Sequence, residues 1–170
     1  MKPKTKSRPE LYGTAQVAEI LGIPEWRVKN FSEGAAYRLP PAHRIGKGRG
    51  SRRLYGWEDI FRIAIADHLV NCGFTAESVG RGVREVPESV LTPYEEFLRF
   101  AYPDRDSLPK QETPLLVSVG GAWEIHNTTE VSRKIKQAMK HHGSDRGLFV
   151  LNLANFCDHV FRRLYDYWSK

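Results

Sequence analysis

The sequence predicts an α+β fold in two parts, a mainly helical first half with one β-hairpin and a second half in which strands and helices follow one another. Three observations support this class: capped helical patterns over residues 14–31, a glycine-broken basic stretch over 43–55, and a glycine pair between two apolar runs over 115–126. We expect a flexible basic arm over residues 1–10, one domain over 11–86 and a second over 87–170.

Two short helices are predicted close to the N-terminus. Thr14 is a suitable N-cap for the first, whose apolar residues share one face, and Gly22 ends it. Pro24 suits the first turn of the second helix, in which Val28 and Phe31 are three residues apart and pack inward. Two short helices joined by a tight turn, the second one polar and basic, form a helix-turn-helix pattern.

A hairpin and two more helices complete the predicted first domain. Two short extended runs around Gly48 and Gly50 are expected to form a β-hairpin wing. Apolar residues then recur at helical spacing from Trp57, and this helix ends near Gly73. Thr75 caps a last helix. The order helix, helix, wing, helix, helix is that of a winged helix-turn-helix unit.

The second half is predicted as a leading helix followed by a small ββαβα module. Thr92-Pro-Tyr-Glu95 is a capping box with proline at the first helical position, and it opens the leading helix. Leu115–Val119 and Ala122–His126 form a hairpin whose tight turn is Gly120-Gly121. A helix over residues 131–139, a strand over 147–153 and a C-terminal helix follow.

The last helix is apolar over more than half of its circumference, which is more than one small sheet can cover. We therefore expect a second copy of the chain to pack against it; the alternative is that the same residues complete the core of a monomer. The residues of this expected dimerisation surface are Phe156, Val160, Phe161, Leu164, Tyr165 and Trp168.

All of the net charge of +6 lies in the first half. Residues 1–86 hold 15 Lys and Arg against 9 Asp and Glu, whereas residues 87–170 hold 11 of each kind. No acidic residue occurs from Gly34 to Trp57, a stretch that contains six cations. Such concentrated positive charge attracts a polyanion, although a solvated loop has the same composition.

Four runs of residues occur in one order along the first half: Tyr12–Ile23, the wing Arg44–Tyr55, Gly56–Phe61 and Cys72–Val79. In this order they resemble the DNA-binding domain of MerR-type regulators, over about residues 11–85. The resemblance implies a winged helix-turn-helix fold that binds double-stranded DNA. It also implies a role in the wing for Arg53 and Tyr55, which match the usual Arg and Tyr of the family.

DNA contacts are expected from both helices and from the wing. The second helix would present Arg27 to guanine and Asn30 to adenine in the major groove, with Trp26 packed beneath the helix. The first helix would offer its N-terminal amides to a phosphate, and the wing cations would contact phosphates or the minor groove. Tyr55 either donates its hydroxyl to a phosphate or anchors the wing to the core. The predicted contact residues are Thr14, Gln16, Glu25, Arg27, Lys29, Asn30, Arg38, Arg44, Lys47, Arg49, Arg52, Arg53 and Tyr55.

Sequence motifs of catalysis are missing, so we expect no enzyme, no metal site and no cofactor. Neither a nucleophile elbow nor a phosphate-binding glycine loop is found. Cys72 and Cys157 are isolated, and each is expected to be a small buried residue.

No apolar stretch approaches the ~18 residues that span a bilayer, and no apolar segment follows the basic N-terminus. Two cysteines are too few for a disulfide framework, so we expect a reducing cytoplasm, with the DNA-binding protein associated with the nucleoid.

These features together predict a sequence-specific DNA-binding transcriptional regulator that acts as a homodimer on an inverted repeat. An unidentified small molecule or protein is a possible effector. Two alternatives remain open. One is an excisionase-like architectural protein that bends DNA, and the other is a protein-interaction adaptor whose basic wing contacts an acidic partner.

Overall fold

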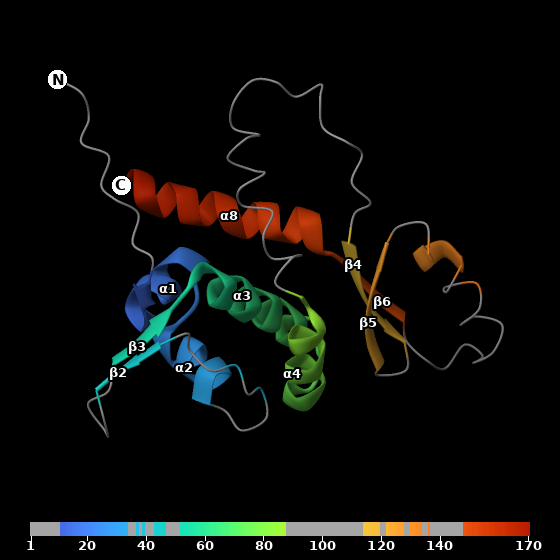
Figure 1. Ribbon diagram of the computed structural model, residues 1–170, viewed down its shortest axis with the longest axis horizontal. Helices are drawn as coiled ribbons and strands as arrows, with labels where there is room; N and C mark the ends of the chain where they lie inside the picture. Colours follow the sequence, from blue (N-terminus) through green and yellow to red (C-terminus); the bar gives the residue numbers. More distant parts are fainter. Residues whose placement is uncertain are drawn as a thin grey trace.

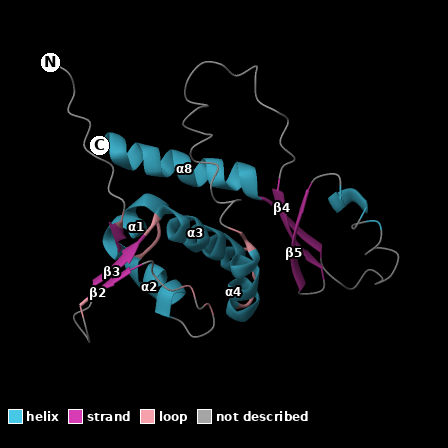
Figure 2. Cartoon of the chain, in the orientation of Figure 1, coloured by secondary structure: helices cyan, strands magenta, loops and turns pink. Residues whose placement is uncertain are grey.

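The structure is a computed structural model, and it shows the α+β class that the sequence predicts, with helices and two three-stranded antiparallel sheets (Figures 1 and 2). The expected N-terminal arm, the helix from Thr92 and most of the helix over 131–139 lie outside the described residues. No helix in the described part is long and apolar enough to cross a membrane. The structure describes residues 11–33, 37, 39, 43–46, 52–87, 114–119, 122–127, 130–133, 136 and 148–170.

The first half has the predicted order of helices and wing, with one additional strand. Strand β1 pairs antiparallel with β3, with Tyr12 opposite Tyr55, so the sheet order is β1-β3-β2. Two residues are too few to show the alternation that predicts a strand. The elements are β1 (Tyr12–Gly13), α1 (Thr14–Leu21), α2 (Glu25–Glu33), β2 (His43–Ile45), β3 (Arg52–Tyr55), α3 (Trp57–Asn71) and α4 (Ala76–Glu85).

Local signals place most of these helix ends correctly. Gly22 and Gly73 have φ angles of 65° and 90°, left-handed conformations that favour glycine and end α1 and α3 as predicted. The hydroxyl of Thr75 caps α4 by accepting a hydrogen bond from a backbone amide 3.4 Å away. The start of α1 differs, because its N-cap is Gly13 and not Thr14. The side chain of Gln16 accepts a hydrogen bond of 2.8 Å from the amide of Gly13.

The second half confirms the predicted hairpin, third strand and C-terminal helix. Its elements are β4 (Pro114–Val119), β5 (Ala122–Asn127), β6 (Leu148–Asn152) and α8 (Leu153–Ser169). Strand β4 lies in the middle of the sheet, in the order β5-β4-β6. Residues 130–133 are helical, and Val131 covers Leu115 and Val117 on one face of the sheet.

One hydrophobic core runs across the domain boundary expected at residue 86. Helix α8 packs against α1 and α3, and β5 packs against α4 (Figure 1). The ring of Phe74 lies 4.9 Å, centroid to centroid, from those of both Trp123 and Phe149. Gly82 lets the ring of Trp123 pack closely against α4, because a Cβ atom at residue 82 would lie only 2.7 Å from that ring.

Helix α8 uses much of its apolar surface inside the chain, which corrects the expectation of a dimerisation surface there. Val160, Phe161 and Leu164 are buried in the shared core, so a second copy has no access to them. Phe156 and Trp168 are half-buried against the same core, and Tyr165 is exposed. The alternative expectation, that these residues complete the core of a monomer, is therefore correct for Val160, Phe161 and Leu164. Sequence patterning shows that a helix is apolar, but it does not show what covers the apolar face.

Candidate nucleic-acid interface

Helix α2 turns one side away from the core. Val28 and Phe31 are buried, whereas Asn30 is exposed and Trp26 is 61% exposed. Residues four apart share a helix face, so Trp26 and Asn30 point outward together. Trp26 was expected beneath the helix, and the structure corrects this. The signal lay in the helical phase, because residue 26 falls opposite the side that Val28 and Phe31 define.

Two further residues predicted to contact DNA flank this outward side. Glu25 and Lys29 form an ion pair of 3.5 Å along the helix surface, with both side chains about half exposed. Exposed pairs of this kind contribute little to stability and exchange partners readily. Glu25, Lys29 and Asn30 are therefore all accessible from solvent on α2.

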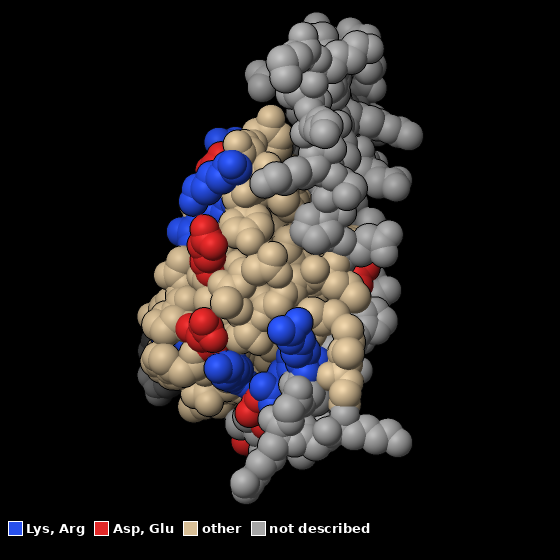
Figure 3. Space-filling view, turned by 90° about the vertical axis from the view of Figure 1, so that its left-hand side faces the viewer, with Lys and Arg blue, Asp and Glu red and all other residues tan. Residues whose placement is uncertain are grey.

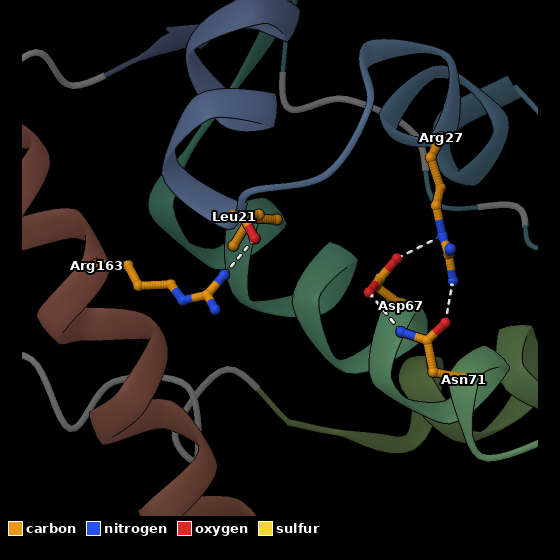
Figure 4. A network of polar contacts seen from close by, with 5 residues as sticks. All are labelled: Leu21, Arg27, Asp67, Asn71 and Arg163. Carbon is orange, nitrogen blue, oxygen red and sulfur yellow. Dashed lines mark hydrogen bonds and ion pairs between the residues drawn. The ribbon is translucent and has the colours of Figure 1, made fainter.

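Arg27 is held against α3 (Figure 4). Its Nε atom lies 2.5 Å from Oδ1 of Asp67, and its Nη2 atom donates a hydrogen bond of 2.6 Å to Oδ1 of Asn71. The amide of Asn71 in turn donates to Oδ2 of Asp67 at 3.0 Å, which closes the network. The guanidinium is thus directed at α3 and not at the outward side of α2, so the position of Arg27 differs from the expected base contact. The network fixes the orientation of α2 on α3.

The wing is attached to α2 through Tyr55, which is completely buried. Its hydroxyl lies 2.8 Å from Oγ of Ser32, and that Oγ donates to the carbonyl of Val28 at 2.7 Å. Because serine has a single hydroxyl proton, Tyr55 is the donor in the first bond. This burial corrects the expected phosphate contact by Tyr55 and supports the alternative that Tyr55 anchors the wing.

Arg53 and Arg52 leave β3 on opposite sides, as neighbouring residues of a strand do. Arg53 forms an ion pair with Glu33 at the end of α2, a second link between wing and helix. Arg52 is exposed and pairs in the hairpin register with Ile45, which is also exposed. Arg44 belongs to β2, but its side chain lies outside the description, as do residues Arg38, Lys47 and Arg49.

The N-terminus of α1 is close to the end of α8 (Figure 1). Gln16 accepts from Gly13 and donates a hydrogen bond of 3.2 Å to the hydroxyl of Tyr167. Trp168 donates to the hydroxyl of Tyr12 at 2.7 Å. Both polar ends of the Gln16 side chain are therefore used within the chain, which corrects its expected contact with a phosphate. Thr14, the other residue expected there, is half-buried.

Basic and acidic side chains are interspersed on the side of the molecule that Figure 3 shows. Around α2 and β3, three of the four described cations have acidic partners: Arg27, Lys29 and Arg53. Arg52 has no acidic partner among the described residues. Arg52 is therefore the described wing cation best placed to meet an external anion.

A groove of about 170 Å³ lies between α1, α3 and α8. Asp67 and Asn71 contribute to its wall, together with Phe156 and His159. Arg163 crosses from α8 to donate a hydrogen bond to the carbonyl of Leu21, at the end of α1 (Figure 4). The groove thus connects α8 to the turn between α1 and α2 and to the residues that hold Arg27.

The two cysteines lie in different environments. Cys157 is buried as expected, and burial raises the pKa of its thiol to about 12. Cys72 is exposed, which corrects the expectation of burial, and its sulfur lies 3.7 Å from Nε2 of His68. Within the described ranges, no group of three or more His, Cys, Asp or Glu side chains is placed to hold a metal ion.

A scan of protein-family models and a search of curated proteins find no match to this chain. What this surface can bind therefore follows from its own geometry. That geometry is an exposed helix face with Trp26, Lys29 and Asn30, linked to a basic β-hairpin by the Tyr55–Ser32 hydrogen bond and the Arg53–Glu33 ion pair.

Proposed function

We propose that this protein is a sequence-specific DNA-binding regulator of transcription, in which α2 enters the major groove and the β2–β3 hairpin contacts the adjacent backbone. One observation carries the proposal: α2 and β3 are linked by Tyr55–Ser32 and Arg53–Glu33, while the outward side of α2 stays exposed. A helix about 10–12 Å across fits a major groove about 12 Å wide. Helix and hairpin would therefore dock as one preorganised unit.

The charge of the first half supports a polyanionic ligand. This half carries the whole net charge of +6, and the acid-free stretch that includes the hairpin holds six of its cations. Cations that neutralise phosphates release condensed counterions, so binding of this kind weakens steeply as salt is added. The exposed Arg52 is available to neutralise a phosphate and so to contribute to this salt-dependent binding energy.

We propose further that two copies bind an inverted repeat. One helix-turn-helix unit contacts few base pairs and buries an area near the lower limit for specific binding, and a symmetric pair doubles both. Because Val160, Phe161 and Leu164 lie in the core of the chain, the copies would meet through a different surface.

The direct experiment is selection of genomic DNA fragments with the purified full chain at roughly physiological salt. We expect enrichment of a motif with two inverted half-sites. No binding to any duplex at low salt contradicts the proposal and favours a protein-interaction adaptor. Binding that bends DNA but enriches no motif favours an architectural role.

A matched pair of arginine variants tests the wing. Arg52→Ala should weaken binding to every duplex and make the negative slope of log K against log salt shallower by about one. Arg162→Ala removes the same charge from an exposed site on α8, on the side of α1 and α3 away from α2 (Figure 1). The control should leave the slope nearly unchanged. Equal slopes for the two variants would remove the wing from the DNA contacts.

A further inference from the structure

We propose that Trp26 recognises the 5-methyl group of a thymine in the major groove. The inference rests on the proposed DNA-binding function and assigns to it a base preference and a residue that determines it. Of the four tryptophans, Trp57 and Trp168 are half-buried, Trp123 is buried, and Trp26 is 61% exposed.

Exposure of this side chain is costly in the free protein. An indole is among the largest apolar side chains, and here it is left in water on the outward side of α2, in the first turn of the helix. Lys29 of α2 and Arg53 of β3 each have an acidic partner on α2, but no described contact covers the ring of Trp26. A large exposed aromatic residue that is attached to a rigid helix is well suited to be buried by a ligand.

The chemistry of the major groove restricts what the indole ring can contact. Base edges there present nitrogen and oxygen donors and acceptors, and the only apolar group among them is the 5-methyl group of thymine. The indole has one N–H donor and no acceptor, so it can replace at most one hydrogen bond that water makes with a base edge, and its ring carbons replace none. Contact with a thymine methyl group is therefore the base contact that best compensates for removing this ring from water.

Asn30 adds a second constraint on the site. It is exposed on the same side of α2 as Trp26, one helical turn further along. Four residues of helix rise about 6 Å, close to two base-pair steps of about 3.4 Å. An asparagine can pair with both N6 and N7 of adenine. We therefore expect each half-site to contain a thymine contacted by Trp26 and an adenine within about two base pairs.

The surrounding charge favours DNA over an apolar protein partner. Lys29 on the same helix surface is paired with Glu25, whereas Arg52, on the hairpin that is fixed to α2, is exposed and has no acidic partner among the described residues. A protein partner that covers the indole is an outcome of the test below.

The experiment uses the full chain and the duplex that the fragment selection enriches most strongly. Each thymine of a half-site is replaced in turn by deoxyuridine, which removes only the methyl group. For the unchanged protein we expect one position per half-site at which affinity falls about fourfold, the effect of one buried methyl group. Trp26→Ala should bind more weakly and, at reduced salt, should bind the thymine and uracil duplexes equally at that position.

Two variants complete the design. Trp26→Phe keeps an apolar ring and should retain part of the thymine preference. Lys29→Ala, an exposed neighbour on α2, should weaken all duplexes alike and keep the thymine-to-uracil ratio. Because Trp26 is exposed, its variants should unfold at the same temperature as the unchanged protein.

Each failure has its own meaning. If no duplex is enriched or bound, the proposed function fails, the inference fails with it, and an acidic protein partner becomes the candidate for this surface. If a motif is found but no uracil substitution weakens binding, DNA recognition stands and the role of Trp26 is overturned. The same conclusion follows if Trp26→Ala keeps the full thymine preference.

Discussion

Arg27 of α2 and Asp67 of α3 form an ion pair with 2.5 Å between Nε and Oδ1, and both side chains are largely shielded from solvent. A cation on the helix proposed to enter DNA is thus committed to holding that helix in place. The hydrogen bond from Arg27 to Asn71 strengthens the same attachment. The orientation of α2 therefore depends on α3 as well as on the wing.

Arg27→Ala should lower the free energy of unfolding by about 1.5–3 kcal/mol, because it leaves the shielded carboxylate of Asp67 without its cation. Urea unfolding measures this. Lys29→Ala is the control and should change stability by less than about 0.5 kcal/mol. The double variant with Asp67→Asn should cost less than the sum of the single variants, and strict additivity would show that the pair does not interact.

Ser32→Ala should destabilise the protein more than Tyr55→Phe does. The first change leaves the buried hydroxyl of Tyr55 without an acceptor, which costs about 1–3 kcal/mol. The second removes that hydroxyl, and Ser32 still donates to the carbonyl of Val28. The double variant should be more stable than Ser32→Ala alone, as measured by chemical unfolding. The reverse order would mean that Tyr55 is not the donor in this pair.

Gly82→Ala should destabilise the protein although alanine favours helices. A Cβ atom there would lie 2.7 Å from the ring of Trp123. Overpacking typically costs about 1–3 kcal/mol, more than the gain of about 1 kcal/mol from helix propensity. Thermal unfolding measures the net effect, with Arg81→Ala, an exposed neighbour on α4, as the control. In a Trp123→Ala background the substitution should become neutral or stabilising, and a penalty that persists there would need another cause.

Phe161→Ala should cost about 3–5 kcal/mol, because it opens a cavity in the core between α8 and the first half. The loss should not depend on protein concentration, since the side chain packs within one chain. Tyr165→Ala, on the exposed side of α8, should change stability by less than about 0.5 kcal/mol. Unfolding at two protein concentrations distinguishes these cases. A loss that varies with concentration would restore Phe161 to a dimer interface.

Cys157 should make the stability of the protein depend on alkaline pH. Burial raises the pKa of its thiol from 9.0 to about 12, so the unfolded chain loses this proton first. The contribution is complete below pH 9 and decreases as pH rises towards 12, by up to about 1.4 kcal/mol per unit. The difference in unfolding free energy between the unchanged protein and Cys157→Ala should therefore shrink between pH 8 and pH 10. Cys72→Ala, at an exposed thiol, is the control; a constant difference for Cys157→Ala would contradict the burial of this group.

The sequence by itself determined the secondary structure of the described chain in most respects. Gly22 and Gly73 end helices because a positive φ costs glycine little, and Thr75 begins one because its hydroxyl caps a free amide. The hairpin of β4 and β5 follows from two apolar runs around a glycine pair. These are interactions between residues close together in the chain, so spacing alone reveals them.

The tertiary structure decided which way the long side chains point and what covers each apolar face. Arg27, Tyr55 and Gln16 all match a DNA-contact pattern in sequence, yet each finds a partner on another element. The buried side of α8 likewise meets α1 and α3 of its own chain. Helical phase places Trp26 outward, but its exposure depends on whether a distant segment covers it. Such contacts join residues tens of positions apart, and periodicity carries no information about them.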